Sequence, residues 1–283
     1  MAEEVKITQG DLYASRIFFY AAVPLLKVVC ESEAKFGDKF KGRNFVFQIS
    51  ALYDGEGSEN GKMGTHFVVE DGVWTTQAGK VHENPDVELC FSNLRKFNVF
   101  FAGKGMVSVL PKMKGVFKNF GIFKDILTAL LRMAGLMQAK DKPEKLEDQI
   151  MLCKLYLYLL PNGISQLNKM GHPDIKAVTE NSPDRTYALI IEDYPELQSW
   201  LRMKMGKSMS GRGEYKRCKP FLAMKFKNPS LALDIMMSKA DMVAYIREEK
   251  LFVDGAPEFA GVVGGLLFKV AYYALGEYLA AEA

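Results

Sequence analysis

The chain has 283 residues, 48% of them hydrophobic and 25% charged, which is the composition of a globular protein with enough apolar residues for two ordinary domains. A formal net charge of +3 is too small to indicate nucleic acid, so we expect no such partner. The polar N-terminus and apolar runs of ten residues (17–26 and 259–268) favour a cytoplasmic protein without a signal peptide or a membrane span. The four cysteines lie far apart, so neither a disulfide framework nor a zinc site is expected.

The first half of the chain shows alternating apolar residues, typical of half-buried strands, between stretches with helical spacing. Asp71-Gly72 predicts the tight turn of a hairpin, because these residues tolerate the positive φ that such a turn requires. In chain order we expect a helix (10–37), a strand (44–53), this hairpin (65–77), a strand (84–91), a short helix capped at Ser92-Asn93, a strand (106–110) and a wide apolar helix (119–137).

A polar segment, 138–148, is the best candidate for a linker in the chain. The second half follows the same plan, except that a Ser/Gly-rich segment (208–213) predicts a loop in place of the Asp-Gly hairpin. Here we expect a helix (149–171), strands (185–193, 199–207, 220–226 and 228–235), a helix capped by Ser238, a short strand (251–255) and a long final helix (257–282).

Two similar phrases support this parallel. NPDVELCF (84–91) and NPSLALDI (228–235) both alternate apolar residues after Asn-Pro, and they lie 228 − 84 = 144 residues apart. A helix, a strand and an apolar helix are expected after each copy. The repetition predicts duplication of a whole domain, with domains at 1–140 and 141–283.

The segment 66–104 resembles the core of the sterol carrier protein type-two family. The resemblance rests on a strand ending in Asp71-Gly72, a strand ending in Gly79, the Pro85–Leu89 strand and a helix ending in Gly103-Lys104. The second half is similar through a smaller set of positions: Pro229, Leu231, Leu233, Lys250 and Asp254-Gly255.

This resemblance implies the fold class α+β. Each of two tandem domains would have a five-stranded, mostly antiparallel sheet covered on one side by helices. It also implies an apolar tunnel between sheet and helices that takes sterols, fatty acyl chains, acyl-CoA or similar lipids. It implies no cofactor and no catalytic apparatus.

The motifs of common enzymes are missing from the sequence. The three histidines form no HExxH or other metal-ligand spacing, and GISQL (163–167) has Leu167 where the nucleophile elbow GxSxG requires glycine. We therefore expect neither an enzyme nor a metal site. An active site assembled from residues far apart in the sequence stays open as an alternative.

Wide apolar helix faces are the stronger lead, because ligand sites are concave and mostly apolar. We expect a ligand cavity lined by apolar residues of both halves: Phe97, Phe101, Phe117, Phe120, Phe123, Leu127, Met203, Met242, Tyr245, Phe259, Val263 and Leu267. The alternative is that these faces only cover their own sheets. Likewise, the glycines of the final helix, Gly261, Gly264 and Gly265, indicate either close packing or room for a ligand tail.

Two basic stretches suggest anionic partners. Lysines alternate with phenylalanines between residues 112 and 124, which suits an anionic lipid surface or an ordinary solvated face. Residues 202–227 contain nine basic residues and one acid, Glu214, so Arg202 and Lys204 are expected to contact an anionic ligand group or to lie on a solvated face.

Taken together, these patterns predict non-catalytic binding or carriage of an apolar ligand. The alternative is a module with closed cavities that docks a membrane, an enzyme acting on lipids or hydrophobic substrates, or a second copy of the chain. The sequence leaves open the identity of the ligand and whether both halves bind it.

Overall fold

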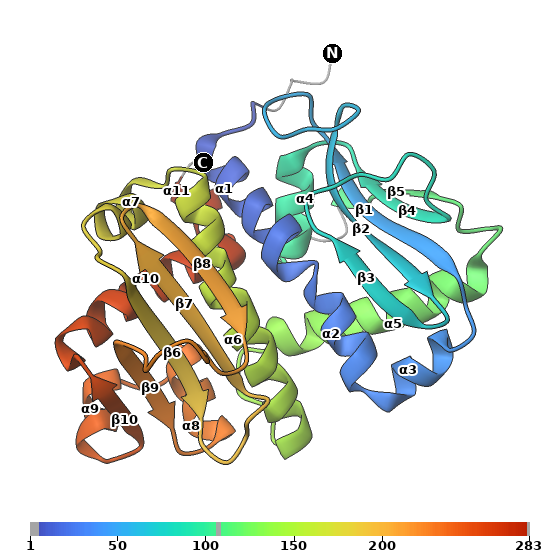
Figure 1. Ribbon diagram of the computed structural model, residues 1–283. Helices are drawn as coiled ribbons and strands as arrows, with labels where there is room; N and C mark the ends of the chain where they lie inside the picture. The colour runs from blue at the N-terminus through green and yellow to red at the C-terminus, as the bar shows by residue number, and fades with distance from the viewer. Residues whose placement is uncertain (1–5, 106–108, 282–283) are drawn as a thin grey trace. The chain divides into compact units, whose positions relative to one another are not determined.

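The computed structural model describes residues 6–105 and 109–281. The chain divides into two compact units (Figure 1), which we call unit 1 (Met1–Gly135 with Tyr272–Ala283) and unit 2 (Leu136–Ala271). The expected boundary was 140/141. The division along the chain falls at 135/136, and residues 272–283 belong to unit 1.

Unit 1 begins with helices that replace the single helix expected at 10–37. A π-helical turn and Pro24, the residue before α2, interrupt it, because proline lacks the N–H that a regular helix needs. The elements are α1 (Gln9–Ile17), η1 (Phe18–Ala22), α2 (Leu25–Ser32), α3 (Ala34–Phe40), β1 (Phe45–Leu52), β2 (Lys62–Glu70), β3 (Val73–Gln77), β4 (Val87–Phe91), α4 (Leu94–Phe101), β5 (Lys112–Lys114) and α5 (Phe120–Met137).

The N-terminal helical segment Gln9–Ser32 is long and apolar enough, by length and composition, to cross a membrane. However, 78% of its most apolar window is buried inside the protein. Phe19 and Leu25 are fully buried, and η1 and α2 pack against β2 and β3. We therefore describe this segment as the core helix of unit 1.

The sheet of unit 1 has the strand order β3-β2-β1-β4-β5. The central pair, β1 and β4, is parallel, and the other pairs are antiparallel. The expectation of a mostly antiparallel sheet is therefore corrected to a mixed one. Apolar residues of alternate positions, such as Phe47 and Ile49, form the buried face against which α4 packs. The Asp71-Gly72 turn between β2 and β3 is as predicted, with φ of 49° and 78°.

Unit 2 repeats this topology. Its elements are α6 (Leu146–Lys169), α7 (Pro173–Glu180), β6 (Arg185–Ile191), β7 (Gln198–Lys204), β8 (Lys207–Arg212), β9 (Leu222–Phe226), α8 (Pro229–Met236), α9 (Met242–Arg247), β10 (Leu251–Gly255), η3 (Pro257–Phe259) and α10 (Ala260–Ala274), which runs into unit 1; the short α11 (Tyr278–Ala281) follows there.

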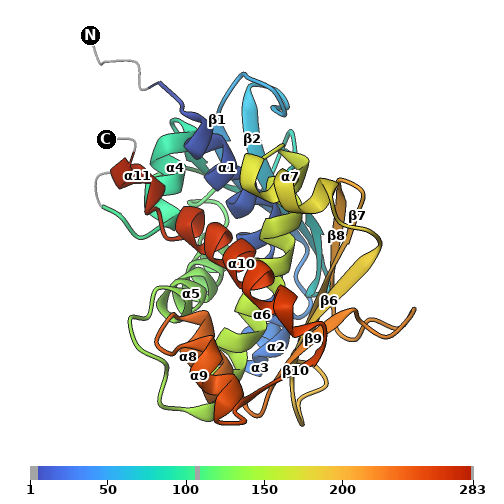
Figure 2. The same cartoon turned by 90° about the vertical axis from the view of Figure 1, so that its left-hand side faces the viewer.

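The strand order of unit 2, β8-β7-β6-β9-β10, is the same as that of unit 1, and β6 and β9 form the parallel pair. Figure 2 shows this sheet with α6, α8 and α10 on one side. The segment expected as a Ser/Gly loop is strand β8. It follows a tight turn at Met205-Gly206, whose φ values of 44° and 78° match those of Asp71-Gly72.

The second copy of the repeated phrase, NPSLALDI, is not a strand but helix α8. The Asn228 side chain accepts a hydrogen bond from the backbone N–H of Leu231, and Pro229 occupies the first helical turn, where its missing N–H costs nothing. Asn93 caps α4 in the same way. The true repeat thus pairs α4 with α8 and β4 with β9, 222 − 87 = 135 residues apart.

Three further expectations change at element ends. The helix expected from Ser238 begins at Met242, with Asp241 as its cap. The strand expected at 106–110 falls largely on 106–108, which lie outside the described residues; the fifth strand is at Lys112–Lys114. The final helix is broken into η3, α10 and α11.

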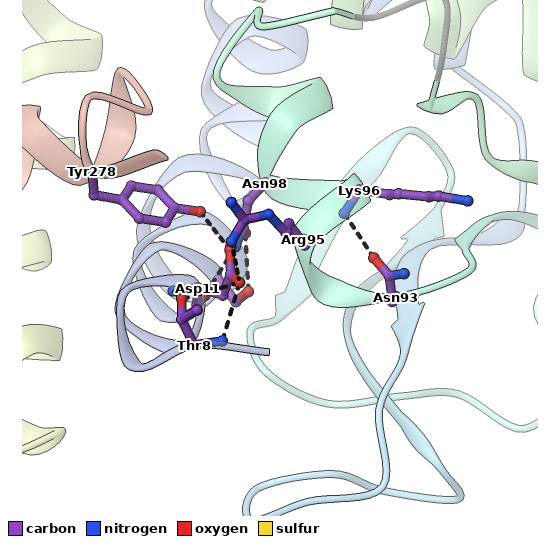
Figure 3. A network of polar contacts seen from close by, with 8 residues as sticks. Thr8, Asp11, Asn93, Arg95, Lys96, Asn98 and Tyr278 are labelled. Carbon is purple, nitrogen blue, oxygen red and sulfur yellow. Dashed lines mark hydrogen bonds and ion pairs between the residues drawn. The ribbon is translucent and has the colours of Figure 1, made fainter. Parts of the chain in front are cut away.

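A buried carboxylate ties the C-terminal segment to unit 1 (Figure 3). Asp11 of α1 is fully buried and accepts hydrogen bonds from Tyr278 (2.9 Å) of α11 and from Arg95 (3.3 Å) of α4. Asn98 of α4 donates to the backbone carbonyl of Asp11 (2.9 Å). The Thr8 side chain caps α1 by accepting from the backbone N–H of Asp11, whose carboxylate accepts in return from the backbone N–H of Thr8. Burial and the neighbouring Asp11 charge raise the pKa of Tyr278, so it stays a neutral donor.

We expect Tyr278→Phe to destabilise unit 1 by about 1.5–3 kcal/mol, because a hydrogen bond to a buried charge is lost. Urea unfolding of the full chain measures this. Lys96→Ala is the matched control on α4, where the exposed Lys96 side chain extends away from Asp11 (Figure 3). An equal effect of both variants would contradict the role given to Asp11.

Candidate ligand-binding site

Unit 2 contains a cavity between its sheet and the helices that cover it. The lining is almost wholly apolar and comes from six elements: Leu160, Leu189, Met224, Phe226, Ile235, Met236, Met242, Gly264, Leu267, Phe268 and Ala271. Its volume is about 40 Å³, room for a few water molecules. Phe268 is 53% exposed, so the cavity reaches the surface beside α10.

The alternation of β9 and the periodicity of α10 place these side chains. Met224 and Phe226, two residues apart, share the inner face of β9. On α10, Gly264, Leu267, Phe268 and Ala271 follow the i, i+3, i+4, i+7 spacing of one helix face. The cavity therefore depends on a strand face and a helix face that meet by ordinary secondary-structure geometry.

Glycine at 264 leaves part of this space open. A Cβ atom there would lie 3.4 Å from the Met242 methyl group, whereas Cβ atoms at Gly261 and Gly265 would meet nothing within 4 Å. Close packing instead involves Gly163 of α6, where an added Cβ would clash with the Val270 side chain. Gly261 and Gly265 are exposed to solvent, so of the three glycines of α10 only Gly264 borders the cavity.

The wall formed by α8 and α9 is adaptable. It contributes Met236 and Met242, whose unbranched side chains rearrange easily. No residue of α9 is buried. The Tyr245 hydroxyl of α9 donates to Asp234 of α8 (2.9 Å), a polar contact that links the two helices, and Lys142 pairs with the same carboxylate (2.8 Å).

In unit 1 aromatic rings fill the equivalent positions. The repeat offset pairs Phe97, Phe100 and Phe101 of α4 with Ala232, Ile235 and Met236 of α8. Phe97 stacks on Phe19 of η1 with ring centroids 4.0 Å apart, and Phe101 contacts Phe97 at 4.7 Å. Larger and stiffer side chains thus occupy in unit 1 the positions of Ile235 and Met236, which line the cavity in unit 2, and of the neighbouring Ala232.

The residues predicted to line a cavity fall into separate places. Met242 and Leu267 line the cavity of unit 2. Phe97, Met203 and Val263 are buried but outside that lining, and Phe101 belongs to the ring cluster of unit 1.

The other predicted lining residues are elsewhere. Phe117, Phe120 and Leu127 lie exposed on the surface, because the buried face of α5 is the opposite one, and Phe123 is half-buried. Tyr245 bonds Asp234, and the Phe259 ring packs against Phe221 and beneath the Arg185 guanidinium (4.4 Å).

Most of the lining was missed by the sequence analysis. Ile235 was assigned to a strand (228–235) and Met236 to no element, which hid their place on α8. Met224 and Phe226 could have been found, because the alternation of 220–226 already marks them as one face of a strand.

Arg202 and Lys204 lie on the outer face of the unit 2 sheet, away from the cavity. Arg202 forms a two-pronged pair with Asp184 (Nε to Oδ1 2.7 Å), and Lys204 lies 3.2 Å from the same carboxylate. Hydrogen bonds from Arg202 hold the pKa of Asp184 well below its usual range. Asp254 likewise pairs Lys219 and Lys225. Acids from outside 202–227 therefore neutralise part of this basic stretch.

A second polar cluster lies on the face of the unit 1 sheet opposite its helices. The buried Glu88 carboxylate accepts hydrogen bonds from Gln48 (2.8 Å), Ser50 (2.7 Å) and Lys62 (2.6 Å). Burial alone would raise the pKa of Glu88, but these hydrogen bonds outweigh it and lower the pKa below 4.5. Each partner is satisfied within the cluster, so its role is structural. Within the described residues, no group of three or more His, Cys, Asp or Glu side chains could hold a metal ion.

We expect the stability that Glu88 contributes to be full above its ordinary pKa of 4.5 and to disappear as pH falls through the lower folded-state value. Glu88→Gln should therefore destabilise the protein at about pH 7, by about 1–3 kcal/mol, and by much less at about pH 3. Urea unfolding at both pH values measures the difference. A difference between variant and wild type that is independent of pH would contradict this account.

No family model matches the sequence, and neither does any curated protein. Among solved structures, the chain is similar to a ubiquinone synthesis protein, UbiJ-SCP2, with 16% identity and a TM-score of 0.30, over 40% of this chain and 96% of that one. A conserved hypothetical protein from Thermus thermophilus, described as a candidate sterol carrier protein, is similar at 13% identity and a TM-score of 0.29, over 43% and 85%.

The inverting sec-alkylsulfatase Pisa1 from Pseudomonas sp. is similar at 14% identity and a TM-score of 0.25, over 60% of this chain and 32% of that one. The likeness to UbiJ-SCP2 and to the candidate sterol carrier protein is weak, with TM-scores of 0.30 and 0.29. At these identities and TM-scores it says nothing about the ligand or any reaction of this chain.

Proposed function

We propose that unit 2 binds an apolar ligand, such as a fatty acyl chain, a sterol or a similar lipid, without catalysing a reaction. The observation that carries this proposal is the cavity under α8, α9 and α10, whose lining is apolar throughout. Such a lining suits hydrocarbon, and burial of a ligand chain would contribute about 0.8 kcal/mol per CH₂.

The cavity must expand to take such a ligand. Its volume of about 40 Å³ is far below the roughly 300–1,000 Å³ of small-molecule sites. The α8–α9 wall is the part that can move, because Met236 and Met242 adapt and α9 buries none of its residues. Ligand entry would then displace α9 and the Met242 side chain away from Gly264.

The small volume also favours a second candidate function. If the cavity never opens, the chain is an interaction module that binds its partners through its surface and not through its interior. The two candidates differ in whether a ligand competes for the space beside Gly264.

Adjacent glycines offer a matched test. In Gly264→Leu the new side chain points at Met242 and fills the cavity, whereas in Gly265→Leu it points to open space. Both changes favour the helix by about 1 kcal/mol, so they do not differ in that respect. The probe is a fatty acid with a conjugated polyene, whose fluorescence rises when it leaves water.

We expect wild type and Gly265→Leu to bind the probe equally, and Gly264→Leu to bind it at least about fivefold more weakly, because overpacking costs about 1–3 kcal/mol. Equal affinity of all three proteins would place the ligand elsewhere. No uptake of the probe, nor of a sterol or acyl-CoA, by wild type would favour the interaction module.

A further inference from the structure

Helix α5 of unit 1 has two apolar faces. Ile126, Ala129 and Met133, at i, i+3 and i+7, are buried. Phe120, Leu127 and Leu131, at i, i+7 and i+11, share the opposite face and are 61%, 38% and 57% exposed. One face is therefore part of the protein core, and the other exposes apolar side chains to solvent.

The segment before α5 adds further exposed apolar residues. Phe117 is fully exposed, and Met113 of β5 is 55% exposed. A phenylalanine without any cover is costly in water, and contiguous exposed apolar groups mark sites of interaction. We call the five residues Met113, Phe117, Phe120, Leu127 and Leu131 the β5–α5 apolar surface.

Lysines surround this surface. They alternate with its apolar residues along the chain: Lys112, Lys114, Lys118 and Lys124. Lys124 lies on the exposed face of α5 itself, four residues after Phe120. Across the described ranges 6–105 and 109–281, none of these four lysines forms an ion pair within the chain.

Acidic residues do not balance these charges. Between residues 110 and 131 the only acid is Asp125. It faces the other way and is held by Arg43 (2.9 Å) and Lys39 (3.3 Å) of the α3 region. The β5–α5 apolar surface is thus surrounded by net positive charge from four exposed lysine side chains.

We propose that the β5–α5 apolar surface docks on an anionic lipid bilayer. Exposed aromatic and aliphatic side chains enter the boundary between head groups and acyl chains, while lysines beside them contact anionic head groups. The charge pattern selects this occupant over a second copy of the chain, because two such basic surfaces would repel each other. The inference goes beyond the ligand of unit 2 and does not depend on it.

Vesicle co-sedimentation of the full chain tests the proposal. The probes are vesicles of phosphatidylcholine with and without phosphatidylserine. We expect sedimentation with the phosphatidylserine vesicles, weakened by added salt, and at least about tenfold less binding to phosphatidylcholine alone. Equal binding to both, or to neither, would overturn the proposal.

Paired variants separate charge from insertion. Lys114→Glu with Lys118→Glu, and Phe117→Ser with Phe120→Ser, should each weaken binding at least about tenfold. Matched controls elsewhere on unit 1 are Lys41→Glu with Lys96→Glu, which gives the same charge change, and Val73→Ser, which removes another exposed apolar group. Controls that weaken binding as much as the variants would overturn the assignment to this surface.

Two further measurements separate other outcomes. Dimerisation of wild type by analytical ultracentrifugation that is lost in the Phe117→Ser, Phe120→Ser variant would identify a second copy as the occupant and overturn the proposal. Gly264→Leu should bind phosphatidylserine vesicles like wild type, so failure of the ligand hypothesis and failure of docking are distinguishable.

Discussion

The parallel pair of strands at the centre of each sheet fixes where the next helix, α4 or α8, begins. In unit 1 the backbone N–H of Asp86 donates to the carbonyl of Val46 (2.9 Å), and in unit 2 Phe221 donates to Thr186 (2.8 Å) in the same way. Each contact starts the fourth strand beside the first. The Asn-capped helix that follows, α4 or α8, must then return across the face of the sheet. The size of the side chains on the inner side of this helix therefore affects how much space is left between helix and sheet.

The two units differ at this helix. Unit 1 places phenylalanines there, and Phe97 stacks on Phe19 of η1 and meets Phe91 of β4 edge to face. Unit 2 places Ala232, Ile235 and Met236 at the equivalent positions, next to an α10 that has glycine at 264. Duplication followed by divergence would explain why the side chains at these equivalent positions differ. We accordingly propose that unit 2 binds the ligand and that unit 1 docks on a membrane through the exposed face of α5.

The sequence predicted much of the fold because its signals were local. Alternation located β1, β6 and β9, Asp71-Gly72 located one hairpin, and the order of elements indicated the duplication. It failed where a local pattern fits two structures. LALDI alternates like a strand, but the cap at Asn228 and the proline after it make it a helix. The Met205-Gly206 turn was missed because methionine at positive φ is unusual, so only the paired strands reveal it.

Less of the site could be predicted, because a cavity arises from several elements distant in sequence. Met242 and Leu267 were named from helical periodicity alone, whereas Leu160, Leu189 and Met224 join them only through the sheet register and the packing of α6. Whether a side chain is exposed to solvent likewise depends on residues that are distant in the sequence. The width of the apolar face of α5 was visible in the sequence, but only the structure shows that Phe120 lies on the uncovered side.

Native mass spectrometry of the purified full chain with a bound lipid tests the central claim most directly, because it counts ligands per chain. The account predicts one apolar molecule per chain, because it places the ligand in unit 2, whereas aromatic rings occupy the equivalent positions of α4 in unit 1. Two molecules per chain, or none after exposure to fatty acids, sterols and acyl-CoA, would contradict it.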